Sequence, residues 1–214
     1  MRRQVKAAIL VVLLQFIVAV YLYPSMPESM ATHWGLSGAA DGYGSKLFGL
    51  FFIPAISAVL LPFFLLLPRA DPSKGLSRSE SGYNWFVLGF TGYMTYIFGL
   101  SLAWNLGWRF DFGQLLTLVA ALGLYGIGVL LSNTEQNWFM GIKTPWTLSS
   151  QTVWTSTHIL GSKLFKISGV LALVGAFLGG WISLLLILGP ILASAVYLIY
   201  YSYAEYQKEA VLQV

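Results

Sequence analysis

Six long apolar segments alternate with polar ones along this chain of 214 residues. A helix needs about 20 apolar residues to cross the hydrocarbon core of a bilayer. None of the six segments contains Asp or Glu, and only Lys166 brings a basic residue into them. The pattern therefore predicts an all-α, polytopic membrane protein with six transmembrane helices, at residues 7–23, 47–67, 84–104, 114–132, 164–180 and 182–201.

Composition supports a lipid environment. Apolar residues make up 57% of the chain and charged residues 9%, whereas a soluble domain has about 25% charged residues. A soluble fold of this size cannot bury so much apolar surface. The chain has no Cys, which excludes disulfides and Cys-based zinc or redox sites.

The Lys and Arg residues indicate the orientation of the helices, because loops on the cytoplasmic side carry an excess of them. With the N-terminus inside, ten lie on the inner side, whereas only Lys46 and Arg109 lie outside. We therefore expect a multi-pass protein of the cell membrane with both termini in the cytoplasm. The basic residues flank apolar segments and form no basic run, so no direct nucleic-acid binding is predicted.

Residues that carry chemistry are sparse. Without an acid inside the spans, a coupled transporter is disfavoured. His33 lies in the first outer loop and His158 in the last inner loop, so about 30 Å of hydrocarbon separates them. The sequence has neither metal-ligand spacing nor a Gly-x-Ser-x-Gly nucleophile motif. We predict no catalytic residue, metal or cofactor, and we expect each His to hydrogen-bond within a loop network.

The first outer loop, residues 24–46, is too long for a simple connection, which usually has about 4–6 residues. Its glycines permit tight turns, so we expect a folded cap. The cap is either a structural lid or a surface that meets an extracellular ligand, and the sequence leaves both open. The candidate contact residues are His33, Trp34, Asp41, Tyr43 and Lys46.

The inner loop, residues 133–163, is the second polar stretch. Pro145 breaks helical continuity, and Thr147 or Ser149 can cap a new helix over residues 149–163. Trp154 and His158 are four residues apart and share a face of that helix. We expect the helix either to lie on the membrane surface or to pack this face against residues 137–147.

The inner loop carries a distinctive set of residues, namely Asn137, Phe139, Gly141, Ile142, Thr144, Pro145, Trp146, Thr147, Leu148, Trp154, Thr157, His158 and Gly161. At these positions the loop resembles the signature of the SdpI family of bacterial and archaeal membrane proteins. Lys143 stands where the family usually has Arg, which loses the bidentate fork of a guanidinium. Gln151 and Ile159 replace residues that are often charged, so this loop carries less charge than is typical.

The outer loop resembles a domain of unknown function that often precedes this family. The resemblance implies an N-terminal unit at 1–67, a cytoplasmic linker at 68–83 and an SdpI-like four-helix unit at 84–214. The matching residues are Pro27, His33, Trp34, Gly38, Asp41, Gly42, Tyr43, Ser45 and Lys46.

What the resemblance implies for function is an immunity or sensor protein without enzymatic activity. The founding member protects its producer from a secreted peptide toxin and holds a transcriptional repressor at the membrane. The implied partners are membrane lipid, an extracellular peptide toxin and a cytoplasmic repressor, and the oligomeric state is not predicted. The implied inner contact residues are Asn137, Phe139, Gly141, Lys143, Thr144, Pro145, Trp146, Thr147, Trp154, Thr157 and His158.

Two other functions fit the sequence. One is a transporter or lipid-handling protein, which requires a continuous polar cavity between the helices that holds a lipid or solute. The other is a membrane enzyme at the inner interface that uses Lys143, His158 and Asn137, which requires an oriented His158 in an accessible cleft.

Overall fold

The computed structural model of the chain describes residues 2–212 and has the predicted all-α architecture. Six of its helices are long and apolar enough to cross a membrane. In each of these helices at most 39% of the most apolar stretch is buried inside the protein, so most of its side chains face outward and need lipid. The six are α1 (Arg3–Leu22), α2 (Lys46–Ala70), α4 (Glu80–Asn105), α5 (Phe112–Leu131), α7 (Gln151–Leu178) and α8 (Gly180–Leu212).

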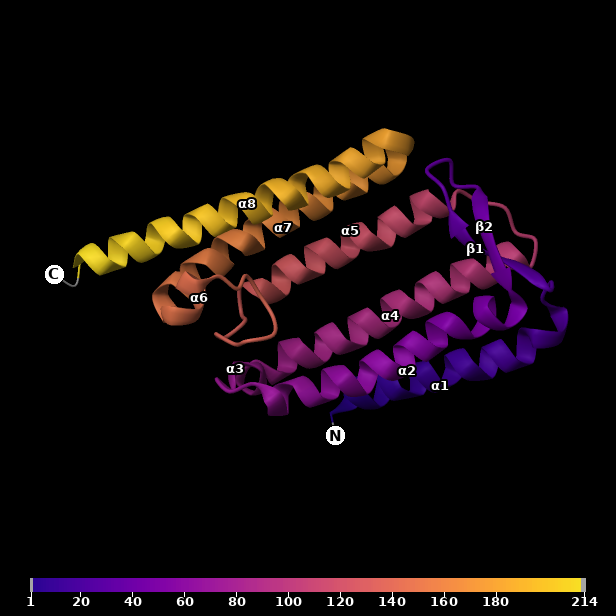
Figure 1. Ribbon diagram of the computed structural model, residues 1–214, viewed down its shortest axis with the longest axis horizontal. Coiled ribbons are helices and arrows are strands. Elements are labelled where there is room, and N and C mark those ends of the chain that lie inside the picture. The colour runs from indigo at the N-terminus through magenta and orange to yellow at the C-terminus, as the bar shows by residue number, and fades with distance from the viewer. Residues whose placement is uncertain (1, 213–214) are drawn as a thin grey trace.

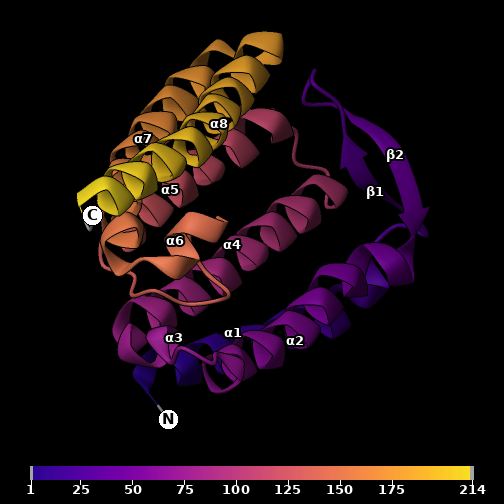
Figure 2. The same ribbon diagram turned by 60° about the vertical axis from the view of Figure 1, so that its left-hand side comes forward.

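The helices form two groups of three (Figures 1 and 2). In one group α1 and α2 pack against α4, and in the other α7 packs between α5 and α8. Both described ends of the chain lie at the same end of the bundle (Figure 1), as an even number of spans requires. The predicted domain boundaries stay a prediction, since helix packing alone does not define them.

Two apolar clusters form the core of the first group, and a polar layer separates them. Ala8 and Val12 of α1 belong to one cluster, and Ala19 belongs to the other. Gln15 lies between them, is 2% exposed and donates to Thr95 Oγ1 of α4 at 2.8 Å. An unpaired amide is costly in hydrocarbon, so this bond fixes α1 against α4.

The outer loop is a β-hairpin at one end of the bundle (Figure 1). It follows a short 3₁₀ turn, η1 (Tyr23–Ser25), and consists of the antiparallel strands β1 (Ser29–Trp34) and β2 (Ala40–Ser45). The prediction of a folded cap is confirmed. Ser45 ends the hairpin and caps α2, since its Oγ accepts from Phe48 N.

Two short helices lie at the opposite end, α3 (Gly75–Arg78) and α6 (Pro145–Ser149). Of the two expectations for residues 149–163, a separate helix on the membrane surface is wrong, because α7 runs without a break from Gln151 to Leu178. The other expectation, that the face of Trp154 and His158 packs against residues 137–147, is confirmed. Ser150, rather than Thr147 or Ser149, caps α7 by accepting from Val153 N. Residues 151–160 contain neither Gly nor Pro, so nothing in the sequence interrupts the helix there. The inner loop packs against these first turns of α7, which explains why they are polar although they belong to a membrane-spanning helix.

Candidate functional site

Asn137 folds the start of the inner loop. Its side chain is fully buried, and its Oδ1 accepts from Phe139 N and Met140 N at 2.9 and 2.6 Å. Its Nδ2 donates to Glu135 O at 2.8 Å. A short amide that bonds its own backbone in this way replaces the hydrogen bonds of a regular element. Asn137 therefore shapes the loop, and none of its side-chain atoms is left for a substrate.

Thr144 and Thr147 form the second fixed turn. Thr147 N donates to Thr144 Oγ1, and Thr144 N donates to Thr147 Oγ1, which is a reciprocal capping box at the start of α6. Pro145 occupies the first helical turn, where its missing N–H costs nothing. Thr144 Oγ1 also lies 3.1 Å from Ser202 Oγ, so the turn is tied to α8.

His158 joins the loop to α7. Its Nε2 lies 3.0 Å from Ile142 N, and its Nδ1 lies 2.8 Å from Trp154 O. Because an amide N–H must donate to Nε2, the proton sits on Nδ1 and donates to the carbonyl. The Trp154 ring stacks on the imidazole at 3.9 Å, and Trp154 Nε1 donates to Thr134 O. The expectation of a hydrogen-bonded His158 on a shared face with Trp154 is confirmed.

Gly141 is needed where the loop meets His158. Its φ is 113°, and a Cβ there would lie 2.3 Å from His158 Nε2. Gly161 of α7 has a similar role, because a Cβ there would lie 2.4 Å from Ile142 Cδ1. Two glycines of the motif thus leave room for Ile142 to pack against α7 and for its N–H to reach His158.

The other motif residues divide into anchors and exposed groups. Phe139 and Met140 pack against the core of α1, α2 and α4, so the loop contacts both groups of helices. The Trp146 ring lies 5.1 Å from that of Tyr203 on α8, and Thr157 is fully buried. Lys143 is exposed, and its Nζ donates to Trp138 O and Phe139 O, so it closes the loop on itself.

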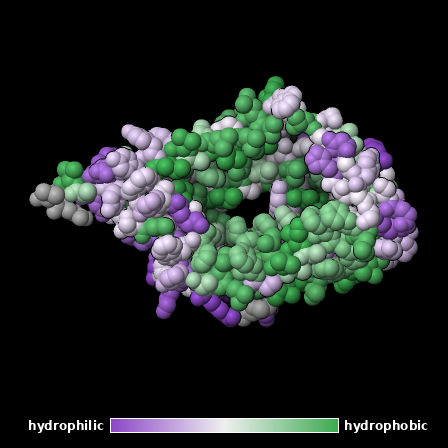
Figure 3. Space-filling model, viewed as in Figure 1, coloured by the Kyte–Doolittle hydropathy of each residue, from purple (hydrophilic) through white to green (hydrophobic). Residues whose placement is uncertain are grey.

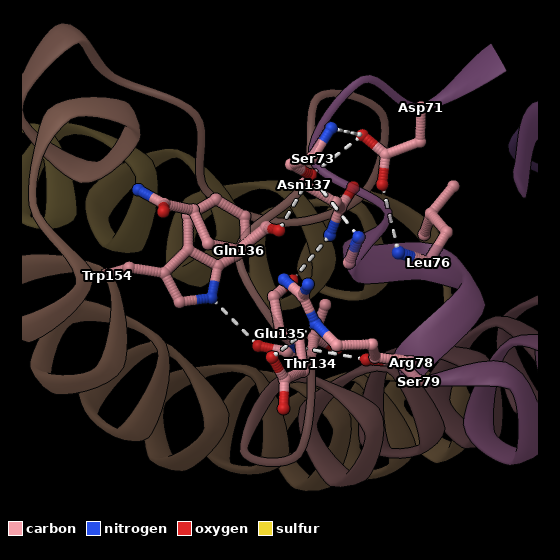
Figure 4. A network of polar contacts seen from close by, with 11 residues as sticks. Asp71, Ser73, Leu76, Arg78, Ser79, Thr134, Glu135, Gln136, Asn137 and Trp154 are labelled. Carbon is pink, nitrogen blue, oxygen red and sulfur yellow. Dashed lines mark hydrogen bonds and ion pairs between the residues drawn. The ribbon is translucent and has the colours of Figure 1, made fainter.

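Asp71 connects the segment 68–83 to the inner loop through Trp138 N, and Figure 4 shows its bonds to Ser73 and Leu76 within its own segment. This carboxylate is 3% exposed. Its Oδ1 accepts from Ser73 N, Ser73 Oγ and Trp138 N, and its Oδ2 accepts from Leu76 N at 3.0 Å. Sequence reasoning treated this segment as a linker and missed Asp71. The available signal was Asp-Pro-Ser, since Asp commonly bonds its own backbone two residues on.

Further contacts extend this inner clasp, which we define as residues 71–79 together with 134–138. Ser73 Oγ donates to Gln136 O, Ser79 Oγ accepts from Glu135 N, and Arg78 pairs with Glu135 at 3.1 Å. Gly75 allows the approach, because a Cβ there would lie 2.0 Å from Gln136 O. The clasp joins the two groups of helices at this end of the bundle.

The hydrogen bonds to Asp71 also set its ionisation. Burial raises the pKa of the carboxyl, but the bonds from Leu76 N, Ser73 Oγ, Trp138 N and Ser73 N outweigh it and hold the pKa below the usual range. A carboxyl with a depressed pKa in the folded protein contributes stability above its unfolded pKa of about 4, and this is lost as the pH falls through the folded value.

We therefore expect the protein to lose thermal stability as the pH falls below about 4, in part through protonation of Asp71. Unfolding temperatures in detergent, measured between pH 7 and pH 2, test this. An Asp71→Asn variant, which cannot titrate there, should show a shallower decline than the wild type over the same interval. Parallel profiles would exclude Asp71 as a source of the acid sensitivity.

The candidate residues of the outer hairpin differ in exposure. His33 and Asp41 form an exposed pair, with Nδ1 and Oδ1 2.5 Å apart, and Tyr43 is 65% exposed. Trp34 instead stacks on Phe112 at 3.7 Å. Lys46 is 8% exposed and pairs with Glu28 at 2.7 Å. The first three side chains are therefore exposed, whereas the last two hold the structure of the hairpin.

Residues of the α4–α5 connection hold the hairpin and were missed in the sequence. Asn105 pairs with both backbone groups of Ala31, since its Oδ1 accepts from Ala31 N and its Nδ2 donates to Ala31 O. Phe112 N donates to Gly38 O at 3.4 Å. The Trp104 ring meets Trp34 edge-on. The hairpin thus contacts both groups of helices, as the inner clasp does at the other end.

The chemistry that these residues support is limited. Within residues 2–212 no group of three or more His, Asp or Glu side chains could hold a metal ion. His158 is 2% exposed and both of its ring nitrogens are engaged, so it lacks the accessible cleft that an enzymatic role requires.

Comparisons with known proteins identify two regions of the chain. Residues 10–58 match a domain of unknown function, DUF1648, and residues 133–202 match the SdpI/YfhL protein family. The chain is 28% identical to the "Immunity protein SdpI" of Bacillus subtilis (strain 168) over 189 residues, which cover 87% of this chain and 88% of the relative. No solved structure matches the chain. The second region comprises the inner loop, α6, α7 and most of α8. The resemblance recognised from the loop motifs is thereby confirmed, and this multi-pass membrane protein has a region that matches the SdpI/YfhL family behind an N-terminal region that matches DUF1648.

Proposed function

We propose that this chain is a membrane immunity protein that protects its cell against a secreted, membrane-active peptide toxin. The observation that carries the proposal is the similarity to an immunity protein over nearly the full length of both chains, at 87% and 88% coverage. The two loops that carry the motifs are held in defined structures at opposite ends of the bundle, which suits a protein that contacts partners on both sides.

In this proposal the hairpin faces the outside, where its exposed residues His33, Asp41 and Tyr43 contact the toxin. The inner loop faces the cytoplasm and presents its exposed Trp138 and Lys143 to a transcriptional repressor, which is held at the membrane while toxin is present. Because hairpin and inner clasp each contact both helix groups, a toxin bound outside would act inside through the relative position of the groups.

We expect the hairpin to be outside and both termini to be cytoplasmic. The chain lacks Cys, so single cysteines report orientation without background. Ser37→Cys in the hairpin and Gln207→Cys near the end of α8 are both exposed positions. In intact cells a membrane-impermeant maleimide should label Ser37→Cys and should label Gln207→Cys only after lysis. The reverse pattern would overturn the orientation.

The protective function is tested in a Bacillus subtilis strain that lacks its own SdpI. We expect expression of this chain to restore survival in spent medium from the parent strain. A His33→Ala, Tyr43→Ala double variant should survive less well, whereas Gln207→Ala, an exposed change at the other end, should protect fully. Equal killing with and without the chain, at a verified membrane level of protein, would contradict protection against this toxin.

The sensor role has its own test. A repressor encoded beside the gene should move into the membrane fraction when toxin is added to cells that express the wild-type chain. Lys143→Ala should weaken this recruitment and leave survival unchanged. A repressor that stays in the cytosolic fraction under both conditions would remove the sensor role and leave the immunity role standing.

A further inference from the structure

Two adjoining cavities lie between α4 and α5, next to the inner clasp. Their volumes are about 320 and 200 Å³, and they share Leu130, Thr134 and Met140. The rim of the first contains the polar residues Arg78, Ser79, Ser81 and Asn133. The second is lined by apolar residues that include Phe86, Ile127 and Leu131. A polar rim above an apolar interior matches an amphiphile rather than a polar solute.

The second cavity leads towards a gap in the seam between α4 and α5. These helices meet at Gly82, where a Cβ would lie 3.5 Å from Leu130, and at Tyr96, whose hydroxyl donates to Leu115 O at 3.2 Å. Because α4 and α5 are antiparallel, these two contacts place Gly89 opposite Gly123. Each glycine lies two turns from Gly82 or Leu130, on the same face of its helix. A Cβ at either glycine would meet nothing within 4 Å.

The seam is therefore closed at Gly82 and Tyr96 but open between them. The space-filling view shows the molecule hollowed between the two groups of helices (Figure 3), and apolar surface borders the hollow. Both helices are membrane spans, so this opening lies at the depth of the hydrocarbon core. An apolar space in contact with lipid takes up acyl chain, because water there would lose hydrogen bonds.

The rim selects the headgroup by charge. Arg78 is the one charged residue among those that line either cavity. Its Nε donates to Glu135 Oε2, and its two terminal amino groups make no hydrogen bond within residues 2–212. A guanidinium binds phosphate through two parallel hydrogen bonds. The rim thus suits an anionic phospholipid better than a zwitterionic one, whose phosphate is offset by a cation.

We propose that the crevice between α4 and α5 binds one anionic phospholipid from the leaflet next to the inner clasp. Its phosphate contacts Arg78 at the rim. One acyl chain passes Phe86 in the second cavity and fills the gap between Gly89 and Gly123. Such a lipid would hold the two helix groups apart along their seam, and its binding does not depend on a toxin.

The test is native mass spectrometry of the detergent-purified full chain titrated with phosphatidylglycerol or phosphatidylcholine. We expect one phosphatidylglycerol to bind about tenfold more tightly than phosphatidylcholine, which corresponds to one charge-assisted hydrogen-bond pair. Arg78→Gln should abolish this preference. Arg69→Gln, an exposed charge at the same end of the bundle but outside the crevice, should keep it.

Two further variants separate the site from structural effects. Glu135→Gln breaks the same ion pair as Arg78→Gln but leaves the guanidinium, so phosphatidylglycerol should bind as tightly or more tightly. Gly89→Leu fills the gap and should weaken both lipids about tenfold. Gly99→Leu, on another face of α4 and also in open space, should not. Equal affinities of the wild type for the two lipids would overturn the proposal. So would equal effects of Arg78→Gln and either of its two controls, or of Gly89→Leu and Gly99→Leu. Displacement of the lipid by inorganic phosphate alone would also overturn it.

Discussion

Replacement of Gly141 by Ala is expected to lower the free energy of unfolding by about 3–5 kcal/mol. The backbone there has a φ of 113°, which a residue with a Cβ adopts only with strain. The added methyl would also lie 2.3 Å from His158 Nε2. His158 can yield only by giving up its bond from Ile142 N and its stack on Trp154, so the loop and the start of α7 separate together.

The measurement is the unfolding midpoint in detergent, with Gly126→Ala as the matched control. Gly126 lies in α5 with nothing within 4 Å of a Cβ, so this change should be neutral or stabilise the helix by up to about 1 kcal/mol. A His158→Ala, Gly141→Ala double variant should lose less than the sum of the single losses, because the clash disappears with the ring. Strict additivity would show that the two residues do not meet.

The helices were predictable from the sequence because a span is a local property. A run of about 20 apolar residues identifies itself without knowledge of its neighbours. The capping motif around Pro145 is local in the same sense, although it places Thr144 at the cap rather than Thr147. The continuity of α7 was not predictable in this way, although its start at Gln151 lies within two residues of the expected one. One face of its polar first turns packs against the inner loop, and a hydropathy pattern does not reveal such a contact.

The candidate residues of the hairpin were predicted as a set, and the sequence could not separate the exposed ones from the packed ones. Trp34 and Tyr43 are both aromatic and both match the motif, yet one stacks on Phe112 and the other faces outward. The difference depends on the α4–α5 connection, which is about 70 residues away in the sequence. Contacts at that separation follow from tertiary packing, so the sequence alone could not show which of these side chains are exposed. The choice between a lid and a binding surface stays a prediction.

Asp71 illustrates the same limit at the inner end, and its replacement has the second large expected effect. Asp71→Ala should cost about 3–5 kcal/mol, because the amides of Leu76 and Trp138 lose an acceptor and each unpaired buried donor costs about 1–3 kcal/mol. Asp71→Asn should cost less, about 2–3 kcal/mol, since one oxygen still accepts while the new amide group faces a donor. Asp41→Ala, which removes an exposed side-chain contact with His33, should cost no more than about 1 kcal/mol.

Hydrogen exchange distinguishes loss of the clasp from a local change at α3. The carboxylate bonds residues on both sides of the clasp, so Asp71→Ala should raise the exchange of segment 71–79 and of segment 134–140 together. A Ser77→Ala variant removes only a bond to Pro68 O within the first segment and should affect that segment alone. If segment 134–140 kept its protection in Asp71→Ala, the inner loop would be held by Phe139, Met140 and His158 without the carboxylate. Loss of protection in both segments would instead show that the inner clasp depends on one buried carboxylate that lies far from the recognised motif in sequence.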